Sequence, residues 1–504
     1  MYTLLSAVVS AGLIVLSLWL RWRYKNSRLL EIAAKIPGPP VVPLFGNSLM
    51  FMCRSEDILS VMKQIITDHG EIIRIWLGPD LNIVVTNPDD IKTLLTSPKT
   101  SVKGPQYKYM ADVLGGGILS GSGVTWRRHR KIASPNYGKK AVEGYTKIIT
   151  QEVDILLLNL NSIPKGKQIN IYKEIVKCTT YTVCQTLLGF NREETSKISH
   201  LQEIIDLSPR IYDITFKRMT KWYLQIDPVF WLTDLHRFQK NFIKLMFDFG
   251  NDIINWRNMK LMAFKNNNIE RPYSEDDNVN NDELSIVDRL ILSNELNNEE
   301  LVHEIFTVFT SSQEASAKIC SYLLLMMAFH PESQETLYKE IHEVIGDKDK
   351  EITEEDFKKM PYLDMVYKEV LRLFPIGAII QRTIQEDITI SSCTIPEGAS
   401  LVIPIYHIQR HERFWKNPEA FDPDRFNPEN SKFRHPYCYI PFSLGPMDCI
   451  GRYFGTKLIK TIAIRVLQKY ALSSQSSYNN LRLTISVSVF SLDGYPVILT
   501  PRSK

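Results

Sequence analysis

Apolar residues along this chain recur mostly with the spacing of helices that bury one face. The helical runs cover residues 142–160, 169–188, 238–262, 298–329, 332–345, 362–374 and 452–470. Segments that alternate or run apolar like strands are shorter, and they cover residues 81–85, 388–390, 400–405 and 483–489. The pattern predicts a mainly α body with small β-sheets, an α+β fold class.

The first 25 residues have a different pattern. Residues 4–20 form an uncharged apolar run of 17 residues, near the lower limit of about 17–25 for crossing a bilayer, and Arg21, Arg23 and Lys25 follow at once. A cleaved secretory signal is the alternative, but its charge normally precedes the apolar core and a small-residue cleavage site follows it. The sequence favours a retained, single N-terminal transmembrane helix in residues 1–25, with the body in the cytosol.

The rest of the chain divides into a short connection and one body. Residues 26–43 contain Ile36-Pro-Gly-Pro-Pro and Pro43, which predicts a spacer and a stiff proline-rich hinge. Residues 271–282 are rich in Asn, Asp and Glu and are expected to be a solvated connection. No internal repeat is evident, so residues 44–504 are expected to form one domain.

Composition narrows the classes of protein. Hydrophobic residues make up 44% and charged residues 23%, as in a globular protein with a large core. Lys and Arg exceed Asp and Glu by 60 − 56 = 4, which is too few to indicate a nucleic-acid partner. The seven cysteines lack paired spacing, which disfavours a disulfide scaffold or a zinc site and favours a reduced, cytosol-facing body.

One cysteine stands in a distinctive setting. The stretch Ile440-Pro-Phe-Ser-Leu-Gly-Pro-Met-Asp-Cys-Ile-Gly-Arg runs into the helix expected at residues 452–470. Amide groups and the positive helix end favour a thiolate at Cys449. Gly445 and Gly451 can take strained dihedrals and would let a flat macrocycle approach the backbone. Phe442 could cover the sulfur side of such a ring. Taken alone, a cysteine between two glycines can also be a small buried hydrophobe.

This stretch resembles the haem-binding loop of the cytochrome P450 superfamily, Phe-x-x-Gly-x-x-x-Cys-x-Gly. The resemblance implies the cytochrome P450 fold, haem b as cofactor and Cys449 as the metal ligand, whose thiolate favours O–O cleavage. Phe442, Gly445 and Gly451 are then cofactor-binding residues. The family usually has Arg two residues before the cysteine, paired with a haem propionate, whereas this chain has Met447.

Further motifs extend the resemblance. Trp126 and Arg130 resemble the Trp-x-x-x-Arg helix whose side chains reach a propionate, which i, i+4 spacing allows. Arg382 matches another propionate-binding position. Each could otherwise be an ordinary surface residue. Glu369-Val-Leu-Arg372 and Arg425 resemble a buried structural cluster behind the haem.

Polar residues at positions 310–316 interrupt the apolar run of the helix expected at residues 298–329. This polar break departs from the family pattern Ala/Gly-Gly-x-Asp/Glu-Thr-Thr/Ser. Counting back from His330-Pro331 places Ser311 to Ser316 on this pattern, with Glu314 as the acid and Ala315 in place of the threonine. The resemblance implies that Glu314 relays protons. Ser316 lies about 100° further round the helix, whereas Ser311 is one turn before Ala315 on the same face and is expected to organise a water.

The chain looks most like the family 4 group, often from arthropods, in which a glutamate can be ester-linked to the haem. Ser311 stands at that position, so an extractable haem is expected. The resemblance covers residue 37 to the C-terminus. It implies a monooxygenase that inserts one oxygen atom from O2 into a lipophilic substrate such as a fatty acid, a terpenoid hormone or a xenobiotic. Electrons come from NADPH through NADPH-cytochrome P450 reductase, with cytochrome b5 as a further partner, at the endoplasmic reticulum membrane.

Two surfaces are expected by position. Arg127, Arg128, Lys131, Arg452 and Lys457 are expected to form a basic surface for an acidic electron donor, although a charge run is often only a solvated face. The pocket wall is expected to comprise residues 107–119, Phe306, Phe309, Thr310, residues 376–380 and residues 490–492.

Two other functions stay open. An isomerase or dehydratase of the same fold would act on oxygenated lipids without external electrons, and loss of the helix threonine motivates it. A haem-binding protein without catalysis is the other, motivated by Met447 and Ala315.

Overall fold

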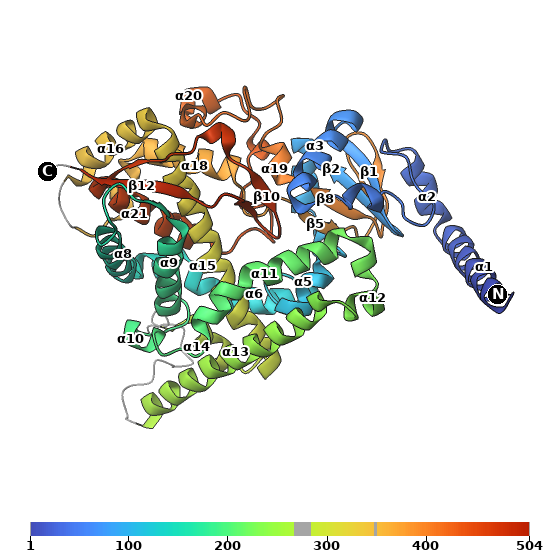
Figure 1. The fold of residues 1–504 in the computed structure, drawn as a ribbon, viewed down its shortest axis with the longest axis horizontal. Helices are drawn as coiled ribbons and strands as arrows, with labels where there is room; N and C mark the ends of the chain where they lie inside the picture. Colours follow the sequence, from blue (N-terminus) through green and yellow to red (C-terminus); the bar gives the residue numbers. More distant parts are fainter. Residues whose placement is uncertain (1, 267–283, 347–349, 503–504) are drawn as a thin grey trace.

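The computed structural model describes residues 2–266, 284–346 and 350–502 (Figure 1). The connection expected at residues 271–282 lies outside these ranges.

Helices dominate the described chain, as the apolar spacing predicts. Their bounds are α1 (Tyr2–Lys25), α2 (Ser27–Ala34), α3 (Ile58–His69), α4 (Pro88–Thr96), α5 (Tyr107–Leu114), α6 (Gly123–Tyr137), α7 (Lys139–Gly144), α8 (Thr146–Asn161), α9 (Tyr172–Thr186), α10 (Arg192–Thr195), α11 (Leu201–Thr220), α12 (Asp227–Trp231), α13 (Asp234–Asn266), α14 (Ile286–Leu292), α15 (Asn298–Phe329), α16 (Pro331–Ile345), α17 (Glu354–Lys358), α18 (Pro361–Leu373), α19 (Ile405–Ile408), α20 (Pro428–Ser431) and α21 (Arg452–Lys469). The predicted fold class, mainly α with small sheets, is confirmed.

The strands are short and form small sheets. They are β1 (Ile72–Leu77), β2 (Asp80–Val85), β3 (Val102–Lys103), β4 (Gln168–Asn170), β5 (Ile380–Thr383), β6 (Ile388–Thr389), β7 (Thr394–Ile395), β8 (Ser400–Ile403), β9 (Tyr470–Ser473), β10 (Leu483–Ile485), β11 (Val489–Ser491) and β12 (Pro496–Pro501). The largest sheet has the order β1-β2-β8-β5-β3, with β2 and β8 parallel and the other neighbours antiparallel. A second sheet has the order β4-β12-β9.

Helix α15 organises the core, and its bounds match the predicted run at residues 298–329. Asn297 caps it, because its side chain accepts the Glu300 amide while the Glu300 carboxylate accepts the Asn297 amide. The helix is buried along most of its length, and α9, α13, α18 and α21 pack against it (Figure 1). A helix covered on all sides must carry few polar groups, so those that it has are candidates for a site.

One predicted strand is wrong. Residues 483–489 were expected to form a single strand, but they form β10, a turn and the start of β11. The chain reverses where the Ser486 amide donates to the Ser488 carbonyl at 3.0 Å. Three small or β-branched residues in a row fit a hairpin turn as well as a strand, and apolar spacing does not separate the two.

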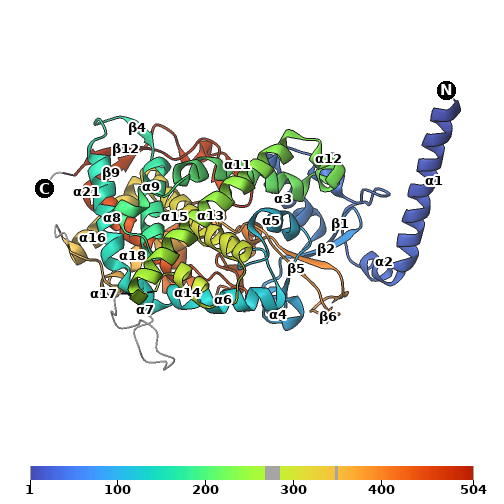
Figure 2. The same cartoon turned by 90° about the horizontal axis from the view of Figure 1, so that it is seen from below.

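The N-terminal region projects from the body. Both views show α1 standing away from the other elements (Figure 2), whereas α2 lies closer, and Ala33 and Ile36 are buried. The Trp22 ring contacts the Trp76 ring edge-on, with centroids 5.7 Å apart. Within the part of the chain that the structure describes, no helix combines the length and apolar character needed to cross a bilayer. The expected transmembrane helix is therefore not confirmed.

Candidate functional site

A cavity of about 520 Å³ lies where α6, α15, β5, the β10–β11 hairpin and the loop before α21 meet. Its volume is within the roughly 300–1,000 Å³ of small-molecule and cofactor sites. Its lining includes six of the predicted cofactor-binding residues: Trp126, Arg130, Arg382, Phe442, Cys449 and Gly451. Both predicted catalytic residues, Ser311 and Glu314, also line it. Residues more than 300 positions apart in sequence therefore share one cavity.

Cys449 lies in the loop before α21 rather than in the helix. The Cys449 amide donates to the Phe442 carbonyl at 2.9 Å, and α21 begins three residues later at Arg452. The residue is accessible, and its accessible surface faces the cavity, because protein atoms surround its other sides.

Burial at Cys449 opposes the effect that the helix end was expected to have on its thiol. Burial raises the pKa of the Cys449 thiol, and the negative charge of Asp448 adds to that effect. The Gly451 amide and the Arg130 and Arg452 guanidiniums act in the opposite direction but are weaker than burial. The loop alone therefore does not favour a thiolate. A coordinated metal ion would, because metal binding deprotonates a thiol outright.

Gly445 has the unusual backbone conformation that the sequence predicted. Its φ is +78°, and a Cβ there would lie 2.1 Å from the Leu95 carbonyl oxygen. The structure adds a second requirement for glycine, the close approach of the end of α4. Gly451 has an ordinary φ of −83°, and a Cβ there would meet only the Tyr137 ring and the Cys449 sulfur at normal contact distances. The Arg452 guanidinium carbon lies over the Phe442 ring, 5.2 Å from the centroid of that ring.

Three cations converge on one wall of the cavity. Arg130 comes from α6, where it also lies 5.7 Å from the Trp126 ring centroid, and Arg382 comes from β5. Arg382 is buried, and burial lowers its pKa. Its guanidinium donates to the Gln381 carbonyl at 3.0 Å. Among the described residues, no carboxylate lies close enough to Arg382 to form an ion pair.

Lys103 is the third cation, and sequence reasoning missed it. It lies directly opposite Arg382 in the β3–β5 pair and lines the same cavity. Burial lowers the Lys103 pKa well below its usual value, with Arg382 and Arg130 adding to the effect. Like charges placed opposite each other on a strand pair are destabilising, so this arrangement fits an anion that binds between them. The register between two strands almost 280 residues apart is not visible in the sequence.

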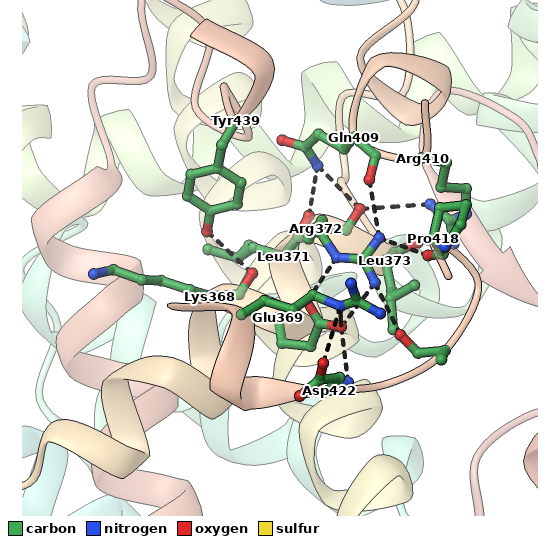
Figure 3. A network of polar contacts seen from close by, with 12 residues as sticks. Lys368, Glu369, Leu371, Arg372, Leu373, Gln409, Arg410, Pro418, Asp422 and Tyr439 are labelled. Carbon is green, nitrogen blue, oxygen red and sulfur yellow. Dashed lines mark hydrogen bonds and ion pairs between the residues drawn. The ribbon is translucent and has the colours of Figure 1, made fainter. Parts of the chain in front are cut away.

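A second charge cluster is buried at the α18 helix (Figure 3). Arg372 donates to both oxygens of Glu369 at 2.6 and 2.7 Å, and both side chains are 0% exposed. The Arg425 Nε lies 3.4 Å from the same carboxylate. The remaining Arg372 donors reach the carbonyls of Gln409, Pro418 and Ala420. The predicted Glu369, Arg372 and Arg425 cluster is therefore present and links α18 to the segment before the cysteine loop.

Comparison with known proteins decides the family. The family model described as Cytochrome P450 matches residues 36–491. This chain belongs to the cytochrome P450 family. It is 29% identical over 490 residues to Cytochrome P450 4c3 of Drosophila melanogaster, covering 95% of this chain and 91% of the relative. It is also 29% identical over 486 residues to Cytochrome P450 4V2 of Rattus norvegicus, covering 95% and 92%. Cytochrome P450 4d1 of Drosophila melanogaster is 28% identical, with 93% of each chain covered.

The family uses haem b, and the cavity of this cytochrome P450 has the donor set that haem needs. Cys449 offers a thiol at one wall, while Lys103, Arg130 and Arg382 offer positive charge at another. Burial lowers the pKa values of Lys103 and Arg382, and two propionates would compensate the charges of these two residues. Met447 is buried and lines the cavity, so it fills with an apolar side chain the place where the family usually has Arg. The residues present therefore fit the group.

The polar break in α15 faces this cavity in part. Thr307, Thr310, Ser311, Glu314 and Ala315 line it. The Ser311 hydroxyl donates to the Thr307 carbonyl at 2.6 Å, which leaves its oxygen lone pairs open to the cavity. Ser312 and Ser316 also line the cavity, and the Ser316 oxygen lies near Gly455 of α21.

Parts of the predicted pocket wall are wrong. Phe306 and Phe309 point away from the cavity and pack on α13, with Phe242 and Phe249 at ring distances of 5.7 and 5.3 Å. The hairpin contributes residues 485–488 rather than residues 490–492, because the turn and not the second strand faces the cavity. The predicted segments 107–119 and 376–380 do line it, through Tyr107, Met110, Ile118, Leu119, Ile376, Gly377, Ile379 and Ile380.

The predicted basic surface is smaller than expected. Arg127, Lys131 and Arg452 are exposed. Arg128 instead pairs with Glu300 at 2.8 Å, and Lys457 is buried with its ammonium 3.9 Å from Glu354.

Proposed function

We propose that this cytochrome P450 inserts one oxygen atom from O2 into a lipophilic substrate, with electrons from NADPH through NADPH-cytochrome P450 reductase and with cytochrome b5 as a further donor. One observation carries the proposal: Cys449 faces a largely apolar cavity that also contains an anion-binding wall. Haem bound through the Cys449 thiolate supplies the activation of dioxygen.

The chain's own residues hold the cofactor from two directions. Cys449 would supply the thiolate that holds the haem iron. Lys103, Arg130 and Arg382, together with the Trp126 indole, would hold the propionates through charge-assisted hydrogen bonds. Lys103 takes the place of the arginine that the family usually has at Met447.

The substrate occupies the apolar part of the cavity. Met110, Ile118, Leu119, Phe216 and Ile376 form walls that exclude water and favour an apolar molecule such as a fatty acid, a terpenoid or a xenobiotic. Displacement of water from these side chains contributes binding free energy in proportion to the apolar area covered.

Protons reach the cavity through α15. Glu314 is the acid that relays them, and it lies on the same helix face as Lys318. Ala315 has no hydroxyl. Ser311 lies one turn earlier, and its oxygen can accept a hydrogen bond from a water that then donates toward the reacting site.

The electron donor docks on the side of Cys449. Arg127, Lys131 and Arg452 are exposed there and give the surface a positive charge. Such a patch increases the rate of encounter with an acidic protein more than it strengthens the complex.

The protein acts at the endoplasmic reticulum membrane, with its catalytic body facing the cytosol. Two apolar surfaces support a membrane contact: Leu13 and Leu18 of α1, and Trp231 and Leu232 at the end of α12, are exposed. Arg21, Arg23 and Lys25 follow the apolar part of α1, where anionic lipid headgroups would attract them.

The test is turnover with isotope-labelled dioxygen. A holoprotein supplied with reductase, NADPH and a panel of lipophilic substrates should yield a product that contains one labelled oxygen atom. An unlabelled product formed without NADPH would instead identify an isomerase or dehydratase. Haem binding with no product across the panel would favour the non-catalytic haem-binding alternative.

A further inference from the structure

A buried ion pair inside the cavity belongs to neither the haem cradle nor the structural cluster. The Lys318 ammonium lies 2.6 Å from the Glu314 carboxylate and donates to the Ser488 hydroxyl, also at 2.6 Å. Lys318 and Glu314 are each 8% exposed, and Ser488 is 7% exposed. The pair therefore joins α15 to the β10–β11 turn at a place that the substrate can reach, because all three residues line the cavity.

The charge balance of this region is neutral. Four other charged residues line the described cavity, namely Lys103, Arg130, Arg382 and Asp448, and they belong to the haem cradle and the cysteine loop. Away from them, Glu314 and Lys318 are the charged lining residues that the structure describes. The negative charge of Glu314 is felt around it, since it adds to burial in raising the pKa of Tyr212.

The three side chains offer both kinds of hydrogen-bonding group. An ammonium has three donors, of which one donates to Ser488, while Glu314 is its ion-pair partner. Ser488 accepts from Lys318, so its own hydroxyl hydrogen remains to donate. A carboxylate has about four acceptor sites, and the buried Glu314 Oε1 atom accepts no hydrogen bond in the described structure. The cluster can therefore both donate to and accept from one small polar group.

We propose that Glu314, Lys318 and Ser488 form a polar subsite for a neutral hydroxyl or carbonyl group on an otherwise apolar substrate. This inference rests on the proposed function, because it takes the cavity to be the substrate site. A carboxylate placed there would bring a second negative charge beside Glu314, with a single cation between the two, and burying uncompensated charge is costly. The subsite thus selects a neutral oxygenated lipid over a free fatty acid.

Three probes that share the same alkyl chain and differ in their polar group test this selectivity for a neutral oxygen group. Equilibrium dialysis of the haem-loaded protein near neutral pH compares 1-dodecanol, dodecyl methyl ether and dodecanoate, without turnover. We expect 1-dodecanol to bind about tenfold tighter than dodecanoate, the size that one lost charge-assisted hydrogen bond gives. The ether should lie between them, because it can accept but not donate.

Two substitutions should change this order in opposite ways. Glu314→Gln leaves Lys318 without its counter-charge, so dodecanoate should gain about tenfold and equal or overtake 1-dodecanol. Lys318→Met should weaken the binding of 1-dodecanol and of dodecyl methyl ether, and Lys318→Arg should restore both in part. Ser488→Ala is a milder variant in case the ion-pair variants fold poorly, and it should weaken 1-dodecanol by roughly threefold to tenfold.

The control is Glu193→Gln, which breaks an exposed i, i+4 pair with Lys197 and should leave all three affinities unchanged. Equal binding of the three probes by the wild-type protein, or an unchanged order in Glu314→Gln, would overturn the subsite. The proposed function fails separately. Labelled product together with an unchanged probe order removes only the subsite, whereas the expected probe order without any product removes only the monooxygenase reaction.

Discussion

The Arg130 guanidinium binds Asp448, the residue immediately before the cysteine, through two hydrogen bonds. One Nη donates to the Asp448 carbonyl at 2.6 Å and the other to its carboxylate at 2.7 Å. Arg130 also lines the cavity beside Trp126. A single side chain of α6 therefore fixes the cysteine loop and contributes to the wall that we assign to the haem propionates.

Replacing Arg130 should loosen the cofactor. Arg130→Leu removes hydrogen bonds to charged groups that contribute about 1.5–3 kcal/mol each, so haem release should accelerate roughly tenfold to a hundredfold. Arg130→Lys should recover only part of this loss, because an ammonium cannot form the paired contacts of a guanidinium. Transfer of haem to an excess of an apo-globin measures the rate. Release at the wild-type rate in Arg130→Leu would contradict the assignment.

Lys103 and Met447 should compensate for each other. Lys103→Met removes one cation of the cradle and should speed haem release about tenfold, by the loss of one charge-assisted contact. Adding Met447→Arg to that variant restores a cation at the usual family position and should slow release again. Lys99→Met, on the neighbouring surface where Lys99 pairs with Glu386, is the matched control. The double variant releasing haem as fast as Lys103→Met would count against the exchange.

Alanine substitutions at two glycines should distinguish the stability cost of backbone strain from the cost of close packing. Gly445 and Gly398 both have a positive φ, at +78° and +81°, but a Cβ has no neighbour within 4 Å at Gly398 and meets the Leu95 carbonyl at 2.1 Å at Gly445. Gly398→Ala should cost about 1–2 kcal/mol from the left-handed conformation alone. Gly445→Ala should cost about 1–3 kcal/mol more because the backbone must move. Urea unfolding compares them, and equal losses would exclude the packing contribution.

His407 should make the protein less stable in acid. Its ring nitrogen Nε2 lies 2.8 Å from the Leu59 carbonyl, and burial lowers its pKa to about 4. An unfolded chain has an ordinary histidine pKa of about 6.5, so the unfolded state binds more protons between these values. The free energy of unfolding should fall by about 3 kcal/mol as the pH drops from about 6.5 to about 4.

The comparison variant for this effect is His407→Gln, which cannot titrate. The difference in unfolding free energy between the wild-type protein and the variant should shrink on acidification through that range. A difference that does not depend on pH would show that His407 titrates normally in the folded state.

Helices, strands and motifs were predicted from the sequence better than the contacts between side chains of distant segments. Helix α15 was predicted with both of its bounds, because its apolar run is long. The Glu369 and Arg372 pair was also predicted, because i, i+3 spacing on a helix fixes which side chains can meet.

Contacts between distant segments were beyond sequence reasoning. Lys103 was missed because its role depends on pairing with Arg382 across two strands. Phe306 and Phe309 were assigned to the pocket by their position in the family resemblance, but they pack against α13 in the core. The close contact at Gly445 was missed for the same reason, since its neighbour Leu95 is 350 residues away.

The most direct test of the account is a reduced, carbon monoxide-difference spectrum of the purified protein and of Cys449→Ser. The account predicts the red-shifted Soret band of thiolate-ligated haem in the wild-type protein and its loss in the variant. A preparation that binds no porphyrin, or a variant with the same band as the wild type, would contradict it.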